Sequence, residues 1–144
     1  MGRQFDVITC LFSSIGYVKS YSSLEKTLDA FYNHLYCGGV AIIEPWFTRD
    51  VFDAGRPSMD VYEDDDLKIA RACVSEVDGD VSILEMHYLV AERGVKVKHF
   101  IDRHELGLFD VEKTLDIMKM VGFEAWFLPD GLMKDRGLYI GKKH

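Results

Sequence analysis

The 144-residue sequence predicts one α/β domain into which an antiparallel sheet is inserted. Three patterns support this fold class: strand–helix–strand over residues 1–45, a loop and strand-like segments over 46–108, and a helix with two strands over 109–144. A chain of this length buries roughly 68–70% of its unfolded surface, so it can hold a core without disulfides or metals.

The first predicted strand covers residues 5–12, which are almost all apolar or β-branched and end at a Ser-Ser-Ile-Gly loop. Such a short apolar run is typical of a parallel strand buried on both faces. A helix follows, with Ser22 or Ser23 as its expected N-cap. Its buried face is marked by apolar residues at helical spacing: Leu24, Leu28, Phe31 and Leu35.

Gly38 and Gly39 are expected to end this helix, because glycine accepts the left-handed cap conformation. A second buried strand, 40–44, is then closed by Pro45. A helical connection between two strands implies that they lie parallel in one sheet.

The middle of the chain has a different pattern. Residues 46–66 are irregular and end in an acidic run, so we expect a surface loop. Three strands are predicted over 67–77, 81–90 and 95–106, with the hairpin signal Asp78-Gly79 between the first two. These segments predict an inserted antiparallel sheet of about three strands.

The last third of the chain again shows the alternation of helix and strand seen over residues 1–45. A helix opens at Phe109-Asp110 and ends at Gly122, with Leu115, Met118 and Val121 on its apolar face. Strands are predicted over 124–128 and 137–141.

Composition excludes several classes of partner. The net charge is −7, from 24 acidic and 17 basic residues, and such a surface repels nucleic acid. No stretch approaches the roughly 18 apolar residues of a membrane span. The three cysteines are widely spaced, and the N-terminus lacks a signal-peptide pattern. We expect a reduced, cytoplasmic protein whose thiols are small buried hydrophobes.

Several segments match a known family. Residues 5–17, FDVITCLFSSIGY, resemble the fourth strand and following loop of class I S-adenosylmethionine-dependent methyltransferases. Residues 35–46, LYCGGVAIIEPW, resemble the family's helix end, L-x-x-G-G turn and fifth strand. Within the family, residues 85–88, 103–109 and 135–139 are most similar to bacterial amino-sugar N,N-dimethyltransferases of macrolide pathways.

The resemblance implies a Rossmann-like sheet in the order 4-5-7-6, the C-terminal half of the family's sheet. The family's D-x-x-x-G-x-G loop and the acidic residue that ends its second strand have no counterpart in this sequence. The resemblance therefore implies a truncated enzyme that uses S-adenosylmethionine but lacks the main portion that binds it. We expect this chain alone to be catalytically weak or inactive.

The same resemblance turns residues 5–12 into an edge strand. An apolar edge with unpaired backbone groups favours association. We expect a homodimer, or a complementing chain, through Phe5–Phe12.

Candidate site residues follow from position and resemblance. Ligands of open α/β sheets bind beyond the carboxyl ends of the strands. Tyr17 and Trp46 follow two such ends, where they line an acceptor site or simply pack. Arg136 precedes the last strand and either holds a nucleotide diphosphate or forms a solvated pair with a local acid.

The resemblance assigns further roles. Tyr17 and His104 are the catalytic candidates, and Ser13 and Ser14 join Trp46 and Arg136 as substrate-binding candidates. The cofactor-binding candidates are Phe12 and Ser13. His104 has an alternative interpretation as a structural or surface histidine.

No metal site is expected. His99 and His104 differ by an odd number of positions along one predicted strand, so they point to opposite faces.

Two functions from different classes remain. The first is an S-adenosylmethionine-dependent N-methyltransferase that acts on a nucleotide-linked amino sugar or a similar small amine. The second is a non-catalytic, dimeric binding or scaffold module derived from such an enzyme. A fragment of a longer protein without an independent role is a third possibility.

Overall fold

The computed structural model describes residues 2–144. It divides into two compact units, one made of residues up to 52 together with 106–144, and one made of residues 53–105. Whether the whole chain behaves as one domain stays a prediction. Within the described residues, neither helix is long and apolar enough to cross a membrane.

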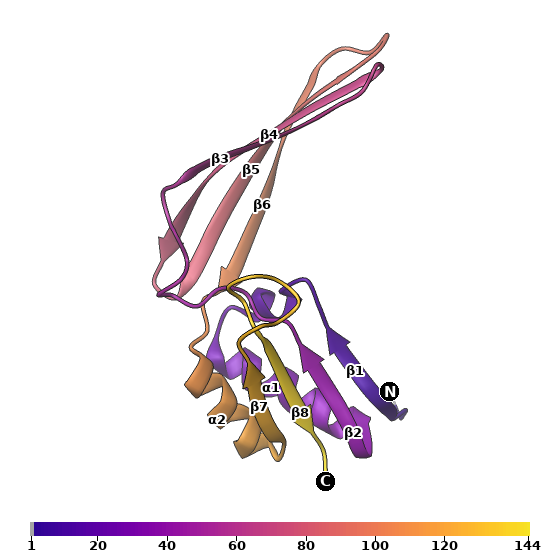
Figure 1. Cartoon of the computed structure of the whole chain (residues 1–144), viewed down its shortest axis with the longest axis vertical. Helices are drawn as coiled ribbons and strands as arrows, with labels where there is room; N and C mark the ends of the chain where they lie inside the picture. The colour runs from indigo at the N-terminus through magenta and orange to yellow at the C-terminus, as the bar shows by residue number, and fades with distance from the viewer. Residues whose placement is uncertain (1) are drawn as a thin grey trace. The chain divides into compact units, whose positions relative to one another are not determined.

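The first unit is a four-stranded sheet with two helices (Figure 1). Its strands run in the order β1-β2-β8-β7. β1 is parallel to β2, and β8 is antiparallel to both of its neighbours. The elements are β1 Phe5–Cys10, the 3₁₀ helix η1 Ser14–Val18, α1 Tyr21–His34, β2 Leu35–Ile43, α2 Val111–Val121, β7 Glu124–Leu128 and β8 Leu138–Lys142. The predicted strand–helix–strand pattern with parallel strands is confirmed.

The core of this unit lies between the sheet and both helices, which cover the same face of the sheet (Figure 1). Leu24 and Leu28 of α1 are fully buried, as their spacing predicts. They pack in one cluster with residues from the sheet and from α2, among them Ala41, Ile43, Met118 and Tyr139.

The bounds of α1 differ from the prediction. Its N-cap is Ser20, whose side chain accepts a hydrogen bond from the Ser23 N–H. The helix ends at His34 without a glycine, because Lys143 Nζ donates to the carbonyls of Tyr32 and Leu35. The expectation that Gly38-Gly39 ends α1 is therefore wrong.

Both glycines lie inside β2. Gly38 has a φ of 85°, a conformation that glycine adopts without strain. It lies where the pairing of β1 with β2 shifts its register, between Phe5 and Val7. The glycine pair thus accommodates an irregularity of the sheet.

The prediction that the first strand is buried on both faces is also wrong. β1 ends at Cys10 and is an edge strand that pairs only with β2 among the described strands. Its side chains are mostly exposed, and Val7 is 53% exposed. The expected burial of all three thiols is wrong as well, because Cys37 is exposed and Cys10 and Cys73 are half-buried.

The C-terminal elements agree closely with the sequence. The side chain of Asp110 caps α2 by accepting from the Lys113 N–H, and Gly122 ends the helix with a φ of 117°. β7 covers the predicted residues. β8 begins one residue late, at Leu138, because Gly137 has a φ of 72°, outside the strand region.

The second unit is an antiparallel sheet in the order β3-β4-β5-β6, one strand more than predicted. Its strands are β3 Pro57–Glu63, β4 Leu67–Asp78, β5 Val81–Glu92 and β6 Lys98–Gly107, which continues into the first unit. The Asp78-Gly79 hairpin is confirmed, with Gly79 at a φ of 57°. Part of the predicted loop over 46–66 is in fact strand β3. The sequence did not indicate it, because every side chain of this edge strand is exposed and no alternation of buried residues marks it.

Candidate functional site

The loop that follows β1 has an unusual backbone. Phe12 and Ser13 are consecutive non-glycine residues with left-handed φ values of 54° and 57°. This conformation is unfavourable for residues with a Cβ atom and persists only where the surroundings enforce it. One such restraint is the 2.7 Å hydrogen bond from the Phe12 N–H to Oε2 of Glu44, the residue that follows β2.

Ser13 connects this loop to two others. Its side chain is 1% exposed, and its Oγ donates a 2.7 Å hydrogen bond to the Pro45 carbonyl. The same Oγ accepts a 3.0 Å hydrogen bond from Nη1 of Arg136. The hydroxyl therefore joins the carboxyl ends of β1 and β2 to the loop that precedes β8.

Arg136 is held between this hydroxyl and two aromatic rings. Its side chain is only 16% exposed. The guanidinium carbon lies 4.6 Å from the ring centre of Trp46 and 4.8 Å from that of Phe47, both within cation–π range. The alternative of a solvated arginine paired with a local acid does not describe this residue, because its acidic neighbour, Glu44, is distant in sequence and buried.

The charge of Arg136 is partly compensated. Burial lowers the pKa of its guanidinium, and the carboxylate of Glu44 opposes that shift. Glu44 Oε1 lies 3.8 Å from Arg136 Nη1, an ion-pair distance without a hydrogen bond. Glu44 Oε1 and Arg136 Nε are both buried and have no hydrogen-bond partner.

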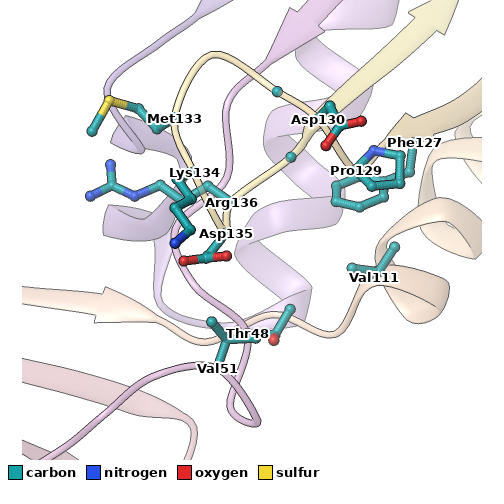
Figure 2. Close-up of a pocket in the computed structure, with 12 residues that line it drawn as sticks. Thr48, Val51, Val111, Phe127, Pro129, Asp130, Met133, Lys134, Asp135 and Arg136 are labelled. Atoms are coloured by element: carbon teal, nitrogen blue, oxygen red, sulfur yellow. The ribbon is translucent and has the colours of Figure 1, made fainter.

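A cavity of about 690 Å³ opens beside this cluster, and Figure 2 shows its lining. In that view Val111 and Phe127 lie on the opposite side from Met133 and Lys134. Its size and mixed apolar and charged lining suit a small organic ligand with charged groups. The lining comes from one unit: Thr48, Val51, Val111, Phe127, Pro129, Asp130, Gly131, Met133, Lys134, Asp135, Arg136 and Gly137.

The other candidates from the sequence are Ser14, Tyr17 and His104. Ser14 Oγ donates a 2.7 Å hydrogen bond to the Leu11 carbonyl, and its substrate-binding role stays a prediction. Tyr17 lies in η1, and its ring is half-exposed. His104 lies in the unit of residues 53–105, where its Nε2 is 2.9 Å from Oδ2 of Asp102. The catalytic roles of Tyr17 and His104 stay predictions.

Sequence reasoning missed Glu44 and Phe47. Glu44 ends a run of apolar strand residues, and a charged residue in that position is a signal for a buried functional group. Phe47 gave no signal of its own, because its role depends on an arginine that lies far along the chain.

The residues expected to meet S-adenosylmethionine offer it little. Ser13 Oγ already donates to Pro45 and accepts from Arg136, and the Phe12 N–H is bound by Glu44. What remains is the Phe12 ring, which is 86% exposed. The described residues fit an apolar contact along one side of this cofactor and do not form a complete site for it.

The described residues contain no group of three or more side chains able to hold a metal ion. Two histidine rings lie next to each other in the unit of residues 53–105, with His87 Nδ1 3.2 Å from His99 Nε2.

Known proteins resemble this chain along almost its whole length. It is 34% identical over 141 residues to a dTDP-3-amino-3,4,6-trideoxy-alpha-D-glucopyranose N,N-dimethyltransferase from Streptomyces venezuelae, and covers 59% of that protein. It is 31% identical to a dTDP-3-amino-3,6-dideoxy-alpha-D-glucopyranose N,N-dimethyltransferase from Streptomyces fradiae, and covers 55% of it. Each alignment includes 98% of this chain. No family model matches the sequence.

Solved structures agree. The sugar N-methyltransferase KedS8 from a Streptoalloteichus species matches with a TM-score of 0.90 and 35% identity, over 100% of this chain and 58% of that one. The amino pentose methyltransferase CalS10 from Micromonospora echinaspora, solved with S-adenosylmethionine bound, matches with a TM-score of 0.89 and 26% identity, over 100% of this chain and 60% of that one. The resemblance to amino-sugar N,N-dimethyltransferases is confirmed, and the chain spans about three-fifths of the length of these relatives.

Proposed function

We propose that this chain is the acceptor-binding portion of an S-adenosylmethionine-dependent N-methyltransferase whose acceptor is an amino sugar linked to a nucleoside diphosphate. One observation carries the proposal. Arg136 donates a hydrogen bond to Ser13 and lies 4.6 Å from the ring centre of Trp46, beside a cavity and at the carboxyl ends of two parallel strands. Ligands of open α/β sheets bind at this place, and a guanidinium can pair two of its N–H groups with a diphosphate.

Roles for the individual residues follow from their positions. Arg136 binds the diphosphate, and Trp46 and Phe47 hold its guanidinium plane in place. Tyr17 lines the amine end of the acceptor. When S-adenosylmethionine is bound, it supplies the methyl group, and this chain's residues orient the amine that receives it. The amine must be neutral to act as a nucleophile, and His104 is the candidate that takes its proton.

The strand order supports this assignment. In the family, strands four, five, seven and six are neighbours, and strand seven is the antiparallel one. Strands β1, β2, β8 and β7 are neighbours in that order, and β8 is antiparallel. The open edge of β1, with Val7 exposed, is then the place where a complementing chain or a second copy adds its strand.

Binding and methylation separate the catalytic proposal from its alternative. The purified chain is titrated by calorimetry with dTDP and with a dTDP-linked 3-amino sugar. It is then mixed with S-adenosylmethionine and the separately expressed N-terminal portion of the Streptomyces venezuelae relative. We expect binding in the micromolar range and N-methylation only in the mixture.

Two other outcomes of this experiment would lead to different conclusions. Binding without methylation supports the non-catalytic binding module. No binding of either nucleotide at millimolar concentration contradicts the proposed acceptor site.

A further inference from the structure

Glu44 is a buried carboxylate that lies next to both the Phe12–Ser13 loop and the Arg136 guanidinium. It follows β2, and its side chain is 3% exposed. Its two oxygens have different surroundings. Oε2 accepts a 2.7 Å hydrogen bond from the Phe12 N–H, whereas Oε1 lies 3.8 Å from Arg136 Nη1 and has no hydrogen-bond partner.

A buried carboxylate is costly unless other groups compensate its charge. The guanidinium of Arg136 is a cationic group that lies next to it. Burial disfavours the charged form of this guanidinium and lowers its pKa, and the carboxylate of Glu44 opposes that shift. The two groups therefore stabilise each other's charge. Removing the charge of Glu44 would leave a buried guanidinium without an anionic partner, and solvent becomes the better place for it.

The arrangement is incompletely satisfied. Arg136 Nη1 donates to Ser13 Oγ, so the Nε–H of Arg136 and Oε1 of Glu44 remain without partners. Glu44 therefore acts on Arg136 through its charge at 3.8 Å and not through a hydrogen bond.

We propose that Glu44 is the positioning residue of this site: one carboxylate holds the left-handed Phe12–Ser13 loop and keeps the Arg136 guanidinium between Ser13 and the rings of Trp46 and Phe47. Its part in ligand binding rests on the proposed function, because Arg136 is the residue that would meet the diphosphate. Its part in placing Arg136 does not depend on any ligand.

The test separates these two parts. In Glu44→Gln the amide oxygen still accepts from the Phe12 N–H, but the charge opposite Arg136 is gone. The chain has two tryptophans, so Trp126→Phe leaves Trp46 as the reporter of the guanidinium that lies 4.6 Å from its ring centre. In that background, Trp46 fluorescence and dTDP affinity are measured for E44Q, R136M, the double variant and the exposed control E25Q.

We expect E44Q to shift Trp46 emission as R136M does, and the double variant to shift it no further. The dissociation constant for dTDP should rise at least tenfold in E44Q and stay unchanged in E25Q. If the wild-type chain binds no dTDP but the emission changes are non-additive, the proposed nucleotide site fails, whereas the positioning of Arg136 by Glu44 is supported.

Other results overturn the inference. They are an unchanged Trp46 emission in E44Q beside a clear shift in R136M, additive shifts in the double variant, or a dTDP affinity in E44Q that equals or exceeds the wild type. Circular dichroism shows whether each variant is folded. If E44Q is unfolded, Glu44→Asp replaces it: this variant keeps the charge but shortens the side chain by one methylene group, which should weaken its contacts with Phe12 and Arg136, and Trp46 emission should shift partway.

Discussion

Arg136 Nη1 donates a 3.0 Å hydrogen bond to Ser13 Oγ, although 123 positions separate the two residues in the chain. Ser13 lies in the loop after β1, and Arg136 lies in the loop before β8. β2 lies between these two strands in the sheet, so the bond spans the carboxyl end of β2. The candidate site depends on this contact, and so do the first two predictions.

Replacing Ser13 with alanine should weaken both stability and binding. The change removes the donor to the Pro45 carbonyl and the acceptor for Arg136, and leaves both of these partners unsatisfied in a buried place. Loss of a buried partner typically costs about 1–3 kcal/mol. Urea unfolding should show a loss of this size in S13A, while the exposed control Ser22→Ala stays close to wild type. Equal stability of the two variants would mean that the hydrogen bonds of the Ser13 hydroxyl do not contribute to the free energy of unfolding.

Replacing Arg136 with lysine should impair nucleotide binding although it keeps the charge. A lysine ammonium has no planar group to stack on Trp46 and Phe47, and it cannot present two parallel donors to a diphosphate. Calorimetry should show a dTDP affinity at least tenfold lower in R136K. The control is Arg93→Lys in the other unit, whose exposed ion pair with Asp66 tolerates the change. Retained affinity in R136K would show that only the positive charge matters.

Elements whose signals are local could be predicted from the sequence. β7 and α2 agree because an N-cap aspartate, a terminal glycine and a short apolar run lie within a few residues of each other. β3 and the end of α1 could not be found in this way. β3 is an exposed edge strand without a buried face, and the end of α1 is satisfied by Lys143, more than a hundred positions away.

The candidate site shows the same limit. Ser13, Trp46 and Arg136 were predicted from strand ends and resemblance, and the structure brings these three together. Glu44 ends an apolar run, which was its one signal, but its two contacts, with Phe12 and with Arg136, form only in the folded chain. His104 lies in the unit of residues 53–105, so its predicted role in proton transfer remains a matter for experiment.

The cap of α2 should contribute measurably to stability. Asp110 Oδ1 accepts a 2.9 Å hydrogen bond from the Lys113 N–H, one of the donors that the first turn of a helix leaves unpaired. Asp110→Ala should lower the free energy of unfolding by about 1 kcal/mol, the usual cost of losing such a cap. Asp116→Ala on the exposed side of the same helix is the control, because its contact with Lys119 is long and solvated. A loss in D116A as large as that in D110A would contradict a capping role.

Tyr139 should make the protein sensitive to alkaline pH. The residue is 2% exposed, and burial raises the pKa of its phenol above the ordinary value of 10.0. Above about pH 10 the unfolded state loses this proton and the folded state keeps it, so stability is fully present below that pH and falls as the pH rises. The slope contributed by one such group reaches about 1.4 kcal/mol per pH unit.

Urea unfolding between pH 8 and pH 11 measures this effect. Tyr139→Phe should flatten the alkaline decline relative to wild type, and Tyr36→Phe, which alters a half-exposed ring, should leave it steep. If Y139F declines as steeply as wild type, other groups cause the alkaline loss.

The open edge of β1 should control association. Phe5 and Val7 are exposed on this strand, with Val7 at 53%, and β2 is its sole partner among the described strands. A lysine on an edge strand discourages pairing with another strand because its charge would have to be buried in the contact. Val7→Lys should therefore shift the chain toward monomer in sedimentation experiments at tens of micromolar, with an unchanged circular dichroism spectrum.

The matched control is Val61→Lys on β3, the exposed edge strand of the other sheet. If V61K dissociates the protein and V7K does not, the interface lies on that sheet. If the wild-type chain is already monomeric at this concentration, self-association is refuted, and a complementing chain is the remaining partner for β1.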